Sequence, residues 1–306
     1  MIQDNPRKET RMANHQEFVH LTRPLLDGSG VACEIRAGMP RLDANDLGVT
    51  RGFGAFEVVH GKGRSLLALE AHLARFERSL SQLGLPALAL DAWRLATARV
   101  VDESGAVDEE FALRYVVTAG AEGVPASGWI RRYASPAELT ERRLYPRSAM
   151  VLNRGTALGE STELPWLLHG VKSLSYAGNL LGERIATEAG CDDAIYATRD
   201  GYLLEGTTAA LLWQRDGVLY TTDYAHGVLP GTTQQAVFEA APTLGLGTEF
   251  GALTLSELGS IEGAWLMSAM RLATAIGSID GRAISVDMEL TARLNESLFA
   301  SMRETS

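Results

Sequence analysis

A change of hydrophobic period within residues 169–213 constrains the fold of this chain more than any other feature. From residue 174 to residue 189, apolar side chains recur at helical spacing. They are Leu174, Ala177, Leu181, Ile185 and Ala189. After Gly190 the period becomes two, and Asp200-Gly201 is typical of a tight turn between two strands. This stretch therefore predicts a helix followed directly by a β-hairpin.

Lys172 and Glu205 occupy unusual positions in this stretch. Lys172 lies in a non-helical HGVK segment directly before the helix, and Glu205 shares a strand face with Leu203. A carboxylate in that setting is costly to bury unless a cation meets it. A lysine and a carboxylate at opposite ends of a ligand suit pyridoxal phosphate (PLP) catalysis, in which the lysine forms a Schiff base and the carboxylate keeps the pyridine nitrogen protonated. On spacing alone, a solvated loop lysine and a surface glutamate remain the commoner interpretation.

Three segments resemble the signature of a known family. They are KSLSYAGN, GCDDAIYATRDGYLLEGTT and VLPGTTQQAVFEAA. In this order they are similar to the class IV aminotransferases, the fold-type IV PLP enzymes, which include branched-chain aminotransferases, D-amino-acid aminotransferases and 4-amino-4-deoxychorismate lyases. The resemblance extends from about Glu17 to about Arg282. It implies PLP as cofactor, with Lys172 as the Schiff-base lysine and Glu205 as the partner of the pyridine nitrogen.

The same resemblance implies the fold. We expect a two-domain α+β architecture, with a small α/β domain and a larger domain that has a β-barrel-like core. Composition shifts near Thr140, which predicts a flexible tail over residues 1–15, a small domain over residues 16–140 and a large PLP-binding domain over residues 141–306. Periodicity further predicts helices over residues 91–104 and 286–302, and a strand over residues 218–221.

Arg75 lies beside the apolar stripe of another predicted helix. The stripe consists of Leu69, Leu73, Phe76, Leu80 and Leu83. An arginine at such a position is usually solvated. However, H-L-x-R-F following RGFGAFE resembles the family's N-terminal block, in which this arginine binds the cofactor phosphate, a task that suits a guanidinium.

A second phosphate contact is expected at residues 229–233. Gly231 opens a helix whose first turn carries Thr232 and Thr233, and free N–H groups there favour an anion. The family uses this turn for the phosphate, and Leu229 matches the residue that packs on the ring face. An ordinary helix cap is the alternative.

Two strands joined around residues 268–271 complete the expected phosphate site. Branched-chain enzymes place a threonine in this turn, where the present chain has Ala269. The hydroxyl of Ser268 or the backbone of Ala269 would then contact the phosphate.

Arg114 is the one charge in FALRYVVTAG, which is typical of a buried strand. A charge in such a run needs an anionic partner. Arg114 matches the position where family members place a basic residue for a substrate carboxylate. A structural ion pair with a nearby acid is an equal alternative.

Composition excludes several classes of partner. The net charge of −10 argues against nucleic acid or an anionic membrane as the main partner. The first fifteen residues lack an apolar core, so we expect neither a signal peptide nor a membrane span there. Cys33 and Cys191 are far apart and without metal-ligand spacing, which fits a reducing cytoplasm and predicts no metal site. The resemblance implies a homodimer acting on small amino-acid-like molecules.

Among the family's activities, three features favour a lyase that releases 4-aminobenzoate and pyruvate from aminodeoxychorismate for folate synthesis. RGFGAFEVV differs from the YG-x-x-VFEGIR form of branched-chain enzymes, Gln234 replaces their arginine, and Ala269 replaces their threonine. Against this, Val58 and Val59 follow Glu57 where lyases carry a catalytic hydroxyl. The alternative is an aminotransferase for D-amino acids or branched-chain amino acids. A non-enzymatic PLP-binding homologue is disfavoured, because phosphate binding alone requires neither Lys172 nor Glu205.

Overall fold

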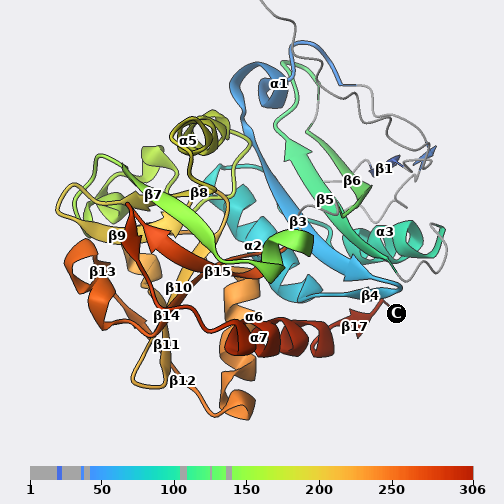
Figure 1. Ribbon diagram of the computed structural model, residues 1–306. Helices are drawn as coiled ribbons and strands as arrows, with labels where there is room; N and C mark the ends of the chain where they lie inside the picture. The colour runs from blue at the N-terminus through green and yellow to red at the C-terminus, as the bar shows by residue number, and fades with distance from the viewer. Residues whose placement is uncertain are drawn as a thin grey trace, which may run out of the picture.

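The structure is a computed structural model of the 306-residue chain, and it describes residues 19–22, 36–37, 42–103, 109–124, 126–135 and 140–305. The predicted N-terminal tail, residues 1–15, and Cys33 lie outside the described residues. Helices and strands alternate along the chain, and the strands form two sheets (Figure 1). The expected α+β class is confirmed.

The first sheet has seven strands in the order β17-β4-β3-β5-β6-β1-β2. Their bounds are β1 Val19–Thr22, β2 Arg36–Ala37, β3 Gly54–Lys62, β4 Ser65–Leu66, β5 Glu110–Thr118, β6 Ser127–Ala134 and β17 Arg303–Glu304. The central strands β3, β5 and β6 pair antiparallel, with Val58 opposite Arg114 and Arg114 opposite Arg131. Because side chains alternate across a strand, these register partners share one face of the sheet.

Among the described residues, this sheet is accompanied by the helices α1 (Leu47–Arg51), α2 (Leu69–Gln82) and α3 (Leu90–Glu103). The predicted helices around residues 69–83 and 91–104 are thereby confirmed. Phe76 of α2, Trp93 of α3 and Tyr115 of β5 are all buried in one apolar cluster, with edge-to-face ring contacts from Phe76 to Trp93 and to Tyr115. Helices α2 and α3 therefore cover one face of the sheet and leave the opposite face for other contacts.

The second sheet closes into a barrel of six strands. They are β7 (Arg147–Asn153), β8 (Asp193–Ala197), β9 (Tyr202–Gly206), β10 (Ala210–Arg215), β14 (Gly263–Ser268) and β15 (Leu272–Ile279). Closure comes from the pairing of Glu205 in β9 with Ala210 in β10. Ile195, Leu203 and Leu266 belong to the apolar cluster of these strands. The expected β-barrel-like core is confirmed.

Shorter elements extend the barrel. The strands are β11 Val218–Thr222, β12 Gly247–Gly251, β13 Leu253–Thr254 and β16 Arg282–Ala283, and the helices are α5 Ala177–Glu188, α6 Thr232–Ala240 and α7 Met288–Ala300. The 3-10 helices are η1 Arg142–Leu144, η2 Glu160–Glu163, η3 Pro165–Leu167, η4 Tyr224–His226, η5 Ala241–Leu244 and η6 Leu255–Ser260. The strand predicted over residues 218–221 and the final helix are both present. From α7 the chain runs to the first sheet, where β17 pairs with β4 (Figure 1).

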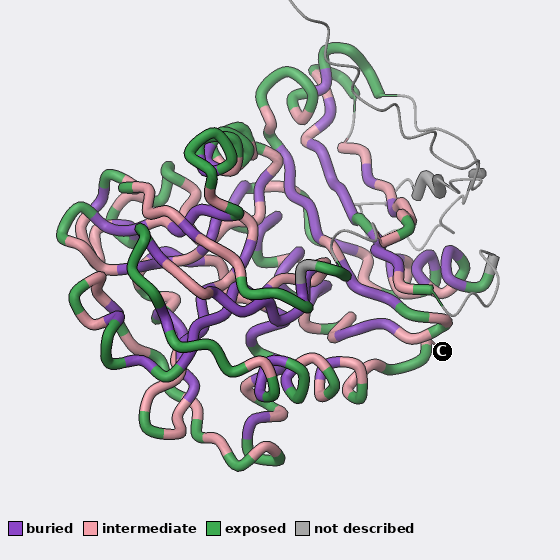
Figure 2. Tube along the Cα trace, viewed as in Figure 1, coloured by how far each residue is buried: buried purple, intermediate pink, exposed green. Residues whose placement is uncertain are grey.

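Helix α5 has the predicted position but an unexpected orientation. Leu181 and Ile185, whose spacing indicates the helix, are 46% and 37% exposed, and Figure 2 shows much of α5 at the surface. The buried residues of α5 are Gly182 and Ala186. A Cβ at position 182 would lie 2.9 Å from a methyl group of Thr207, so the close approach of the barrel selects small residues. The apolar stripe thus faces away from the barrel.

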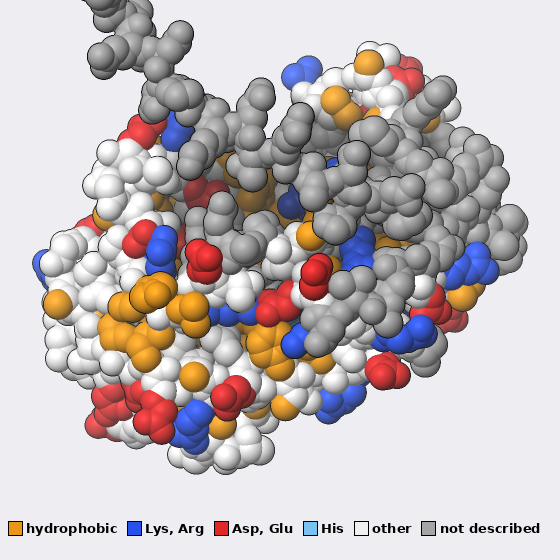
Figure 3. Space-filling model, turned by 45° about the vertical axis from the view of Figure 1, so that its right-hand side comes forward, with side chains coloured by type: hydrophobic (Ala, Val, Ile, Leu, Met, Phe, Trp, Pro, Cys, Tyr) orange, Lys and Arg blue, Asp and Glu red, His pale blue; other side chains and the backbone are white. Residues whose placement is uncertain are grey.

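The described strands before residue 140 belong to the first sheet, and those from 147 to 283 belong to the second. Only β17 among the described strands crosses this division. The domain boundary near Thr140 stays a prediction. In the described part of the chain, no helix is both long enough and apolar enough to cross a membrane. Acidic and basic side chains are interspersed over the face of the molecule that Figure 3 shows.

Candidate active site

A cavity of about 1270 Å³ lies where the first sheet, the barrel and the first turns of α5 and α6 meet. All ten residues that the sequence suggested for the site line this cavity. They are Arg75, Arg114, Lys172, Glu205, Leu229, Gly231, Thr232, Thr233, Ser268 and Ala269. The fold thus brings the predicted residues together; their individual roles stay predictions.

Lys172 is held by its backbone against the first sheet. Its N–H donates to the hydroxyl of Ser79 on α2 (3.2 Å), and its carbonyl accepts from the N–H of Phe56 on β3 (3.0 Å). The side chain extends over the ring of Phe56, with Nζ 4.5 Å from the ring centroid. Burial, aided by the charge of Arg75, lowers the pKa of Lys172 to about 8. A lysine in this state can act as a nucleophile or a base near neutral pH.

Glu205 is positioned by backbone and side-chain groups at the end of β9. Its Oε2 accepts from the N–H of Leu229 (3.0 Å), and its Oε1 lies 3.7 Å from Nη1 of Arg154. Burial raises the pKa of Glu205 to about 7, although Leu229 and Arg154 oppose this shift. A cationic group placed beside this carboxyl would therefore favour its ionised form.

Arg154 is a cavity residue that the sequence interpretation missed. It donates to the carbonyl oxygens of His226 (2.9 Å) and Gly227 (2.8 Å), which orients the guanidinium toward Glu205. The cation expected beside Glu205 is thus present within the protein. The requirement that a buried carboxylate meets a cation could have prompted a search for it, but no local pattern identifies Arg154 as that partner.

The first turn of α6 forms an anion cradle. Thr232 and Thr233 are 4% and 2% exposed, and the N–H groups at a helix N-terminus lack intrahelical acceptors. The buried hydroxyl of Thr233 has no hydrogen-bond partner among the described residues. Gly231 allows close approach, because a Cβ there would lie 3.0 Å from the Cβ of Ala210. An unpaired buried hydroxyl beside free N–H groups fits a phosphate.

Arg75 lines the same cavity and is 5% exposed. The alternative that it is a solvated residue on the helix surface is therefore wrong. Its Nε and Nη2 donate to the two carboxylate oxygens of Glu57 (2.7 and 2.8 Å), and its Nη1 donates to the carbonyl of Pro230 (2.7 Å). These bonds occupy three of the five N–H groups of the guanidinium. The remaining donors are available to an anion in the cavity.

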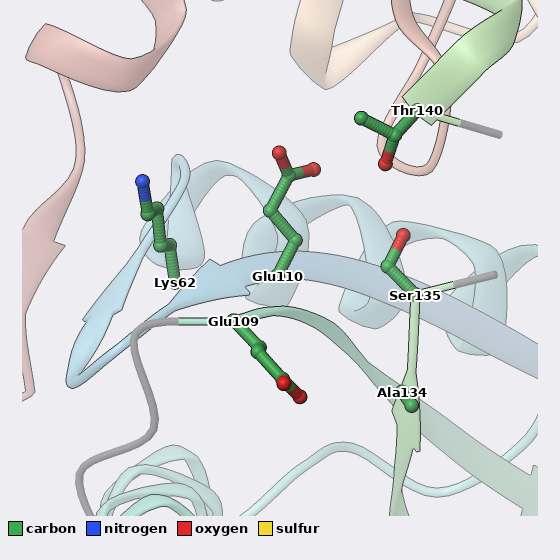
Figure 4. Close-up of a pocket in the computed structure, with 6 residues that line it drawn as sticks. All are labelled: Lys62, Glu109, Glu110, Ala134, Ser135 and Thr140. Carbon is green, nitrogen blue, oxygen red and sulfur yellow. The ribbon is translucent and has the colours of Figure 1, made fainter. Parts of the chain in front are cut away.

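The turn between β14 and β15 contributes Ser268 and Ala269, as its predicted position requires. Arg143 supports this turn by donating to the carbonyl oxygens of Met270 and Arg271, and it also pairs with Glu110 of the first sheet. Glu110 in turn lines a second cavity of about 250 Å³. Figure 4 shows it pointing between Lys62 and Thr140. None of the ten predicted site residues lines this smaller cavity.

The wall opposite the barrel is the face of the first sheet that carries Arg114. Arg114 is exposed within an otherwise buried β5, so the expectation of a buried charge is wrong. Among the described residues no carboxylate forms an ion pair with Arg114, and its guanidinium lies over the ring of Tyr133 at 5.2 Å. Arg131, its register partner on β6, lies over the same ring at 4.5 Å. Sequence interpretation missed Arg131 and Tyr133, although alternation along residues 129–133 could have placed them on one face.

The fit to PLP is supported by this arrangement: Lys172 and Glu205 line the same cavity as an anion cradle that has an unpaired hydroxyl. Among the described residues no group of three or more His, Cys, Asp or Glu could hold a metal ion.

Comparison with known proteins identifies the family of this chain. The family described as amino-transferase class IV matches residues 54–279. A bifunctional aminodeoxychorismate lyase / D-amino acid transaminase of Mycobacterium tuberculosis is 35% identical over 260 residues, which cover 81% of this chain and 89% of that protein.

Solved structures agree. A fold IV transaminase from Curtobacterium pusillum has a TM-score of 0.86 at 35% identity, covering 93% of this chain and 98% of that chain. A hypothetical aminotransferase from M. tuberculosis in its PLP-bound form has a TM-score of 0.82 at 33% identity, covering 93% and 99%. The chain therefore belongs to the class IV aminotransferases and is a PLP-dependent enzyme.

Proposed function

We propose that this enzyme is a 4-amino-4-deoxychorismate lyase that releases 4-aminobenzoate and pyruvate. The observation that carries the proposal is a cavity with Lys172 and Glu205 on its cofactor side and two arginines, Arg114 and Arg131, on its other wall. The lyase substrate bears two carboxylates, and guanidinium groups are well suited to binding them. The M. tuberculosis relative, whose name includes this activity, supports the choice.

The cofactor is held by the residues that the sequence suggested. Thr232, Thr233 and the free donors of Arg75 bind the phosphate, together with the hydroxyl of Ser268 or the backbone of Ala269. Leu229 packs on the ring face, and Gly231 permits close approach of the backbone. Bound PLP supplies an electron sink for charge that develops at the substrate α-carbon.

Two side chains act on protons. Glu205 would accept a hydrogen bond from the ring nitrogen and stabilise its protonated form. Lys172 would hold the cofactor through Nζ and would move a proton at the substrate α-carbon. Its pKa of about 8 leaves part of the amine neutral near pH 7, as a base requires.

Transamination of D-amino acids is the second candidate. Val58 lies in the cavity wall opposite Arg114, at the position where lyases carry a catalytic hydroxyl, and this valine favours transamination. The relative's name also includes D-amino acid transaminase. Branched-chain substrates are disfavoured, because their apolar side chains would face the two arginines.

We further infer a homodimer in the cytoplasm. Leu180 lines the cavity and is 58% exposed, and Leu181 and Trp166, sequence neighbours of cavity-lining residues, are 46% and 70% exposed. A second copy of the chain would cover such apolar side chains. The described cysteine, Cys191, is free, which fits a reducing compartment.

A product assay tests the activity. Purified protein loaded with PLP is offered aminodeoxychorismate without any keto acid. Steady release of 4-aminobenzoate and pyruvate over many turnovers is expected. If instead no product forms, but D-alanine and 2-oxoglutarate exchange their amino group, the enzyme is a D-amino acid transaminase.

A further inference from the structure

Beneath the phosphate cradle, His72 of α2 connects two other elements. It is 1% exposed, its Nδ1 lies 2.8 Å from Oε2 of Glu57 on β3, and its Nε2 lies 3.0 Å from the hydroxyl oxygen of Thr232 on α6. Both ring nitrogens of a buried histidine are thus engaged. One partner is a carboxylate, and the other is a hydroxyl in the turn expected to bind phosphate.

Glu57 fixes the direction of the first bond. Burial alone would raise the pKa of Glu57, but Arg75 and His72 together lower it well below its usual range. The ionised carboxylate can only accept, so Nδ1 of His72 carries the proton and donates to Glu57. In a neutral imidazole Nε2 is then an acceptor, and the hydroxyl of Thr232 must donate to it.

The charges around His72 favour this neutral form. Burial lowers the pKa of His72, and the cations Arg75 on its own helix and Lys172 before α5 lower it further, whereas Glu57 on β3 opposes them. Thr232 of α6 is uncharged. In this state the Thr232 hydroxyl proton is directed at the imidazole, so it is not available to an anion in the cradle.

We propose that the Glu57–His72–Thr232 chain of hydrogen bonds reverses at its second bond when a phosphate dianion binds. His72 takes up a proton from solvent at Nε2, and this N–H donates a hydrogen bond to the hydroxyl oxygen of Thr232, whose own hydrogen turns to the phosphate. His72 is therefore a positioning residue that makes the cradle responsive to the charge of its ligand. The inference rests on the proposed phosphate site at the start of α6.

A dependence of affinity on pH follows. A ligand that favours protonated His72 binds more weakly as pH rises between the pKa of His72 in the free protein and its higher pKa in the complex. The loss approaches about tenfold per pH unit within that window. The second ionisation of a free phosphate monoester, near about pH 6, strengthens binding as pH rises, so affinity is compared with His72→Asn to isolate the contribution of His72.

The test uses the full chain freed of cofactor, with imidazole nitrogens labelled, and pyridoxamine 5'-phosphate as probe, because this compound forms no bond to Lys172. Nitrogen NMR reports the protonation of each histidine, and the His72 signal is identified by its loss in His72→Asn. We expect its titration midpoint to rise by about one pH unit or more on saturation. A midpoint that does not move in the wild-type complex overturns the proposal.

Two neighbouring threonines provide matched variants. Thr233→Val removes a direct phosphate donor, so it should weaken probe binding about tenfold while leaving the His72 shift intact. Thr232→Val interrupts the chain, so it should reduce the shift. A shift that is equally large in Thr232→Val would contradict the relay.

The same variants separate this inference from the site on which it rests. If neither valine variant weakens binding, the phosphate does not lie at the start of α6 and the proposed site is wrong. If Thr233→Val weakens binding but the titration midpoint of His72 is the same with and without the probe, the site is correct and the relay is wrong. Inorganic phosphate as a second probe should reproduce a smaller shift of the same sign.

Discussion

The two walls of the cavity differ in how their side chains are held. On the cofactor side, Arg75, Thr232 and Glu205 each have hydrogen-bond partners from other elements, and Arg75 and Thr232 are almost fully buried. On the opposite wall, Arg114 is exposed and contacts the ring of Tyr133. One side is preorganised by a network, and the other presents an exposed arginine on a sheet face.

This difference predicts different roles for the two walls of the cavity. A network of buried polar groups keeps a fixed geometry, because breaking any member leaves its partners unsatisfied. A sheet face can change one side chain with little effect on its neighbours. We therefore expect substitutions on the cofactor side to affect all reactions of the enzyme, and substitution of Arg114 on the sheet wall to affect substrate choice alone.

Lys172→Ala gives the largest expected effect, because it removes both the cofactor-binding amine and the proposed base. Turnover should fall at least about 1,000-fold with every substrate, and the visible absorption of lysine-bound cofactor should disappear. Lys62→Ala, which changes another of the three lysines of the chain, is the control and should keep both. Persistence of the absorption band in Lys172→Ala would refute the assignment.

Glu205→Gln should lower turnover about 100-fold for lyase and transaminase reactions alike, because a neutral amide does not stabilise a protonated ring nitrogen. Cofactor should still bind, since the phosphate cradle is unchanged. Steady-state rates and cofactor titration measure the two effects, with the exposed Glu249→Gln as control. A loss of turnover with one substrate only would show that Glu205 acts on substrate choice, and it would contradict the proposed difference between the two walls.

The same carboxyl should destabilise the cofactor-free protein at high pH. Burial raises the pKa of Glu205 to about 7 in the folded protein, so ionisation of this carboxyl opposes folding as pH rises from the ordinary range of a glutamate toward that value. Relative to Glu205→Gln, the wild type should lose on the order of 2 kcal/mol in free energy of unfolding by pH 8. Urea unfolding at pH 5 and pH 8 measures it. Equal differences between the two proteins at both pH values would exclude the effect.

Arg114→Ala should have the smallest and most selective effect. The KM for aminodeoxychorismate or D-glutamate should rise about tenfold, whereas cofactor affinity and the KM for D-alanine should change little, because only the first two substrates carry a second carboxylate. Steady-state kinetics with the three substrates checks this. Unchanged KM values for the dicarboxylates would show that Arg114 does not contact the substrate.

Much of the site was predictable because it depends on short segments. HGVK before a helix and GYLLEGTT in a hairpin drew attention to Lys172 and Glu205, and PGTT drew attention to the start of α6. Helix and strand positions also followed from periodicity. The burial of single residues did not: Leu181 is exposed although it marks the helix stripe, and Arg114 is exposed although its strand is apolar.

The sequence by itself determined the family, the cofactor and the order of helices and strands, because local spacing and turn chemistry encode these. Only the tertiary structure decided which groups meet. His72 and Thr232 are 160 residues apart in the chain, and Arg75 reaches Glu57 across the interface of α2 with β3. The charge on Glu57, the tautomer of His72 and the pKa values of Lys172 and Glu205 depend on burial and on such distant neighbours. No local pattern records those contacts, since desolvation and charge pairing act through space.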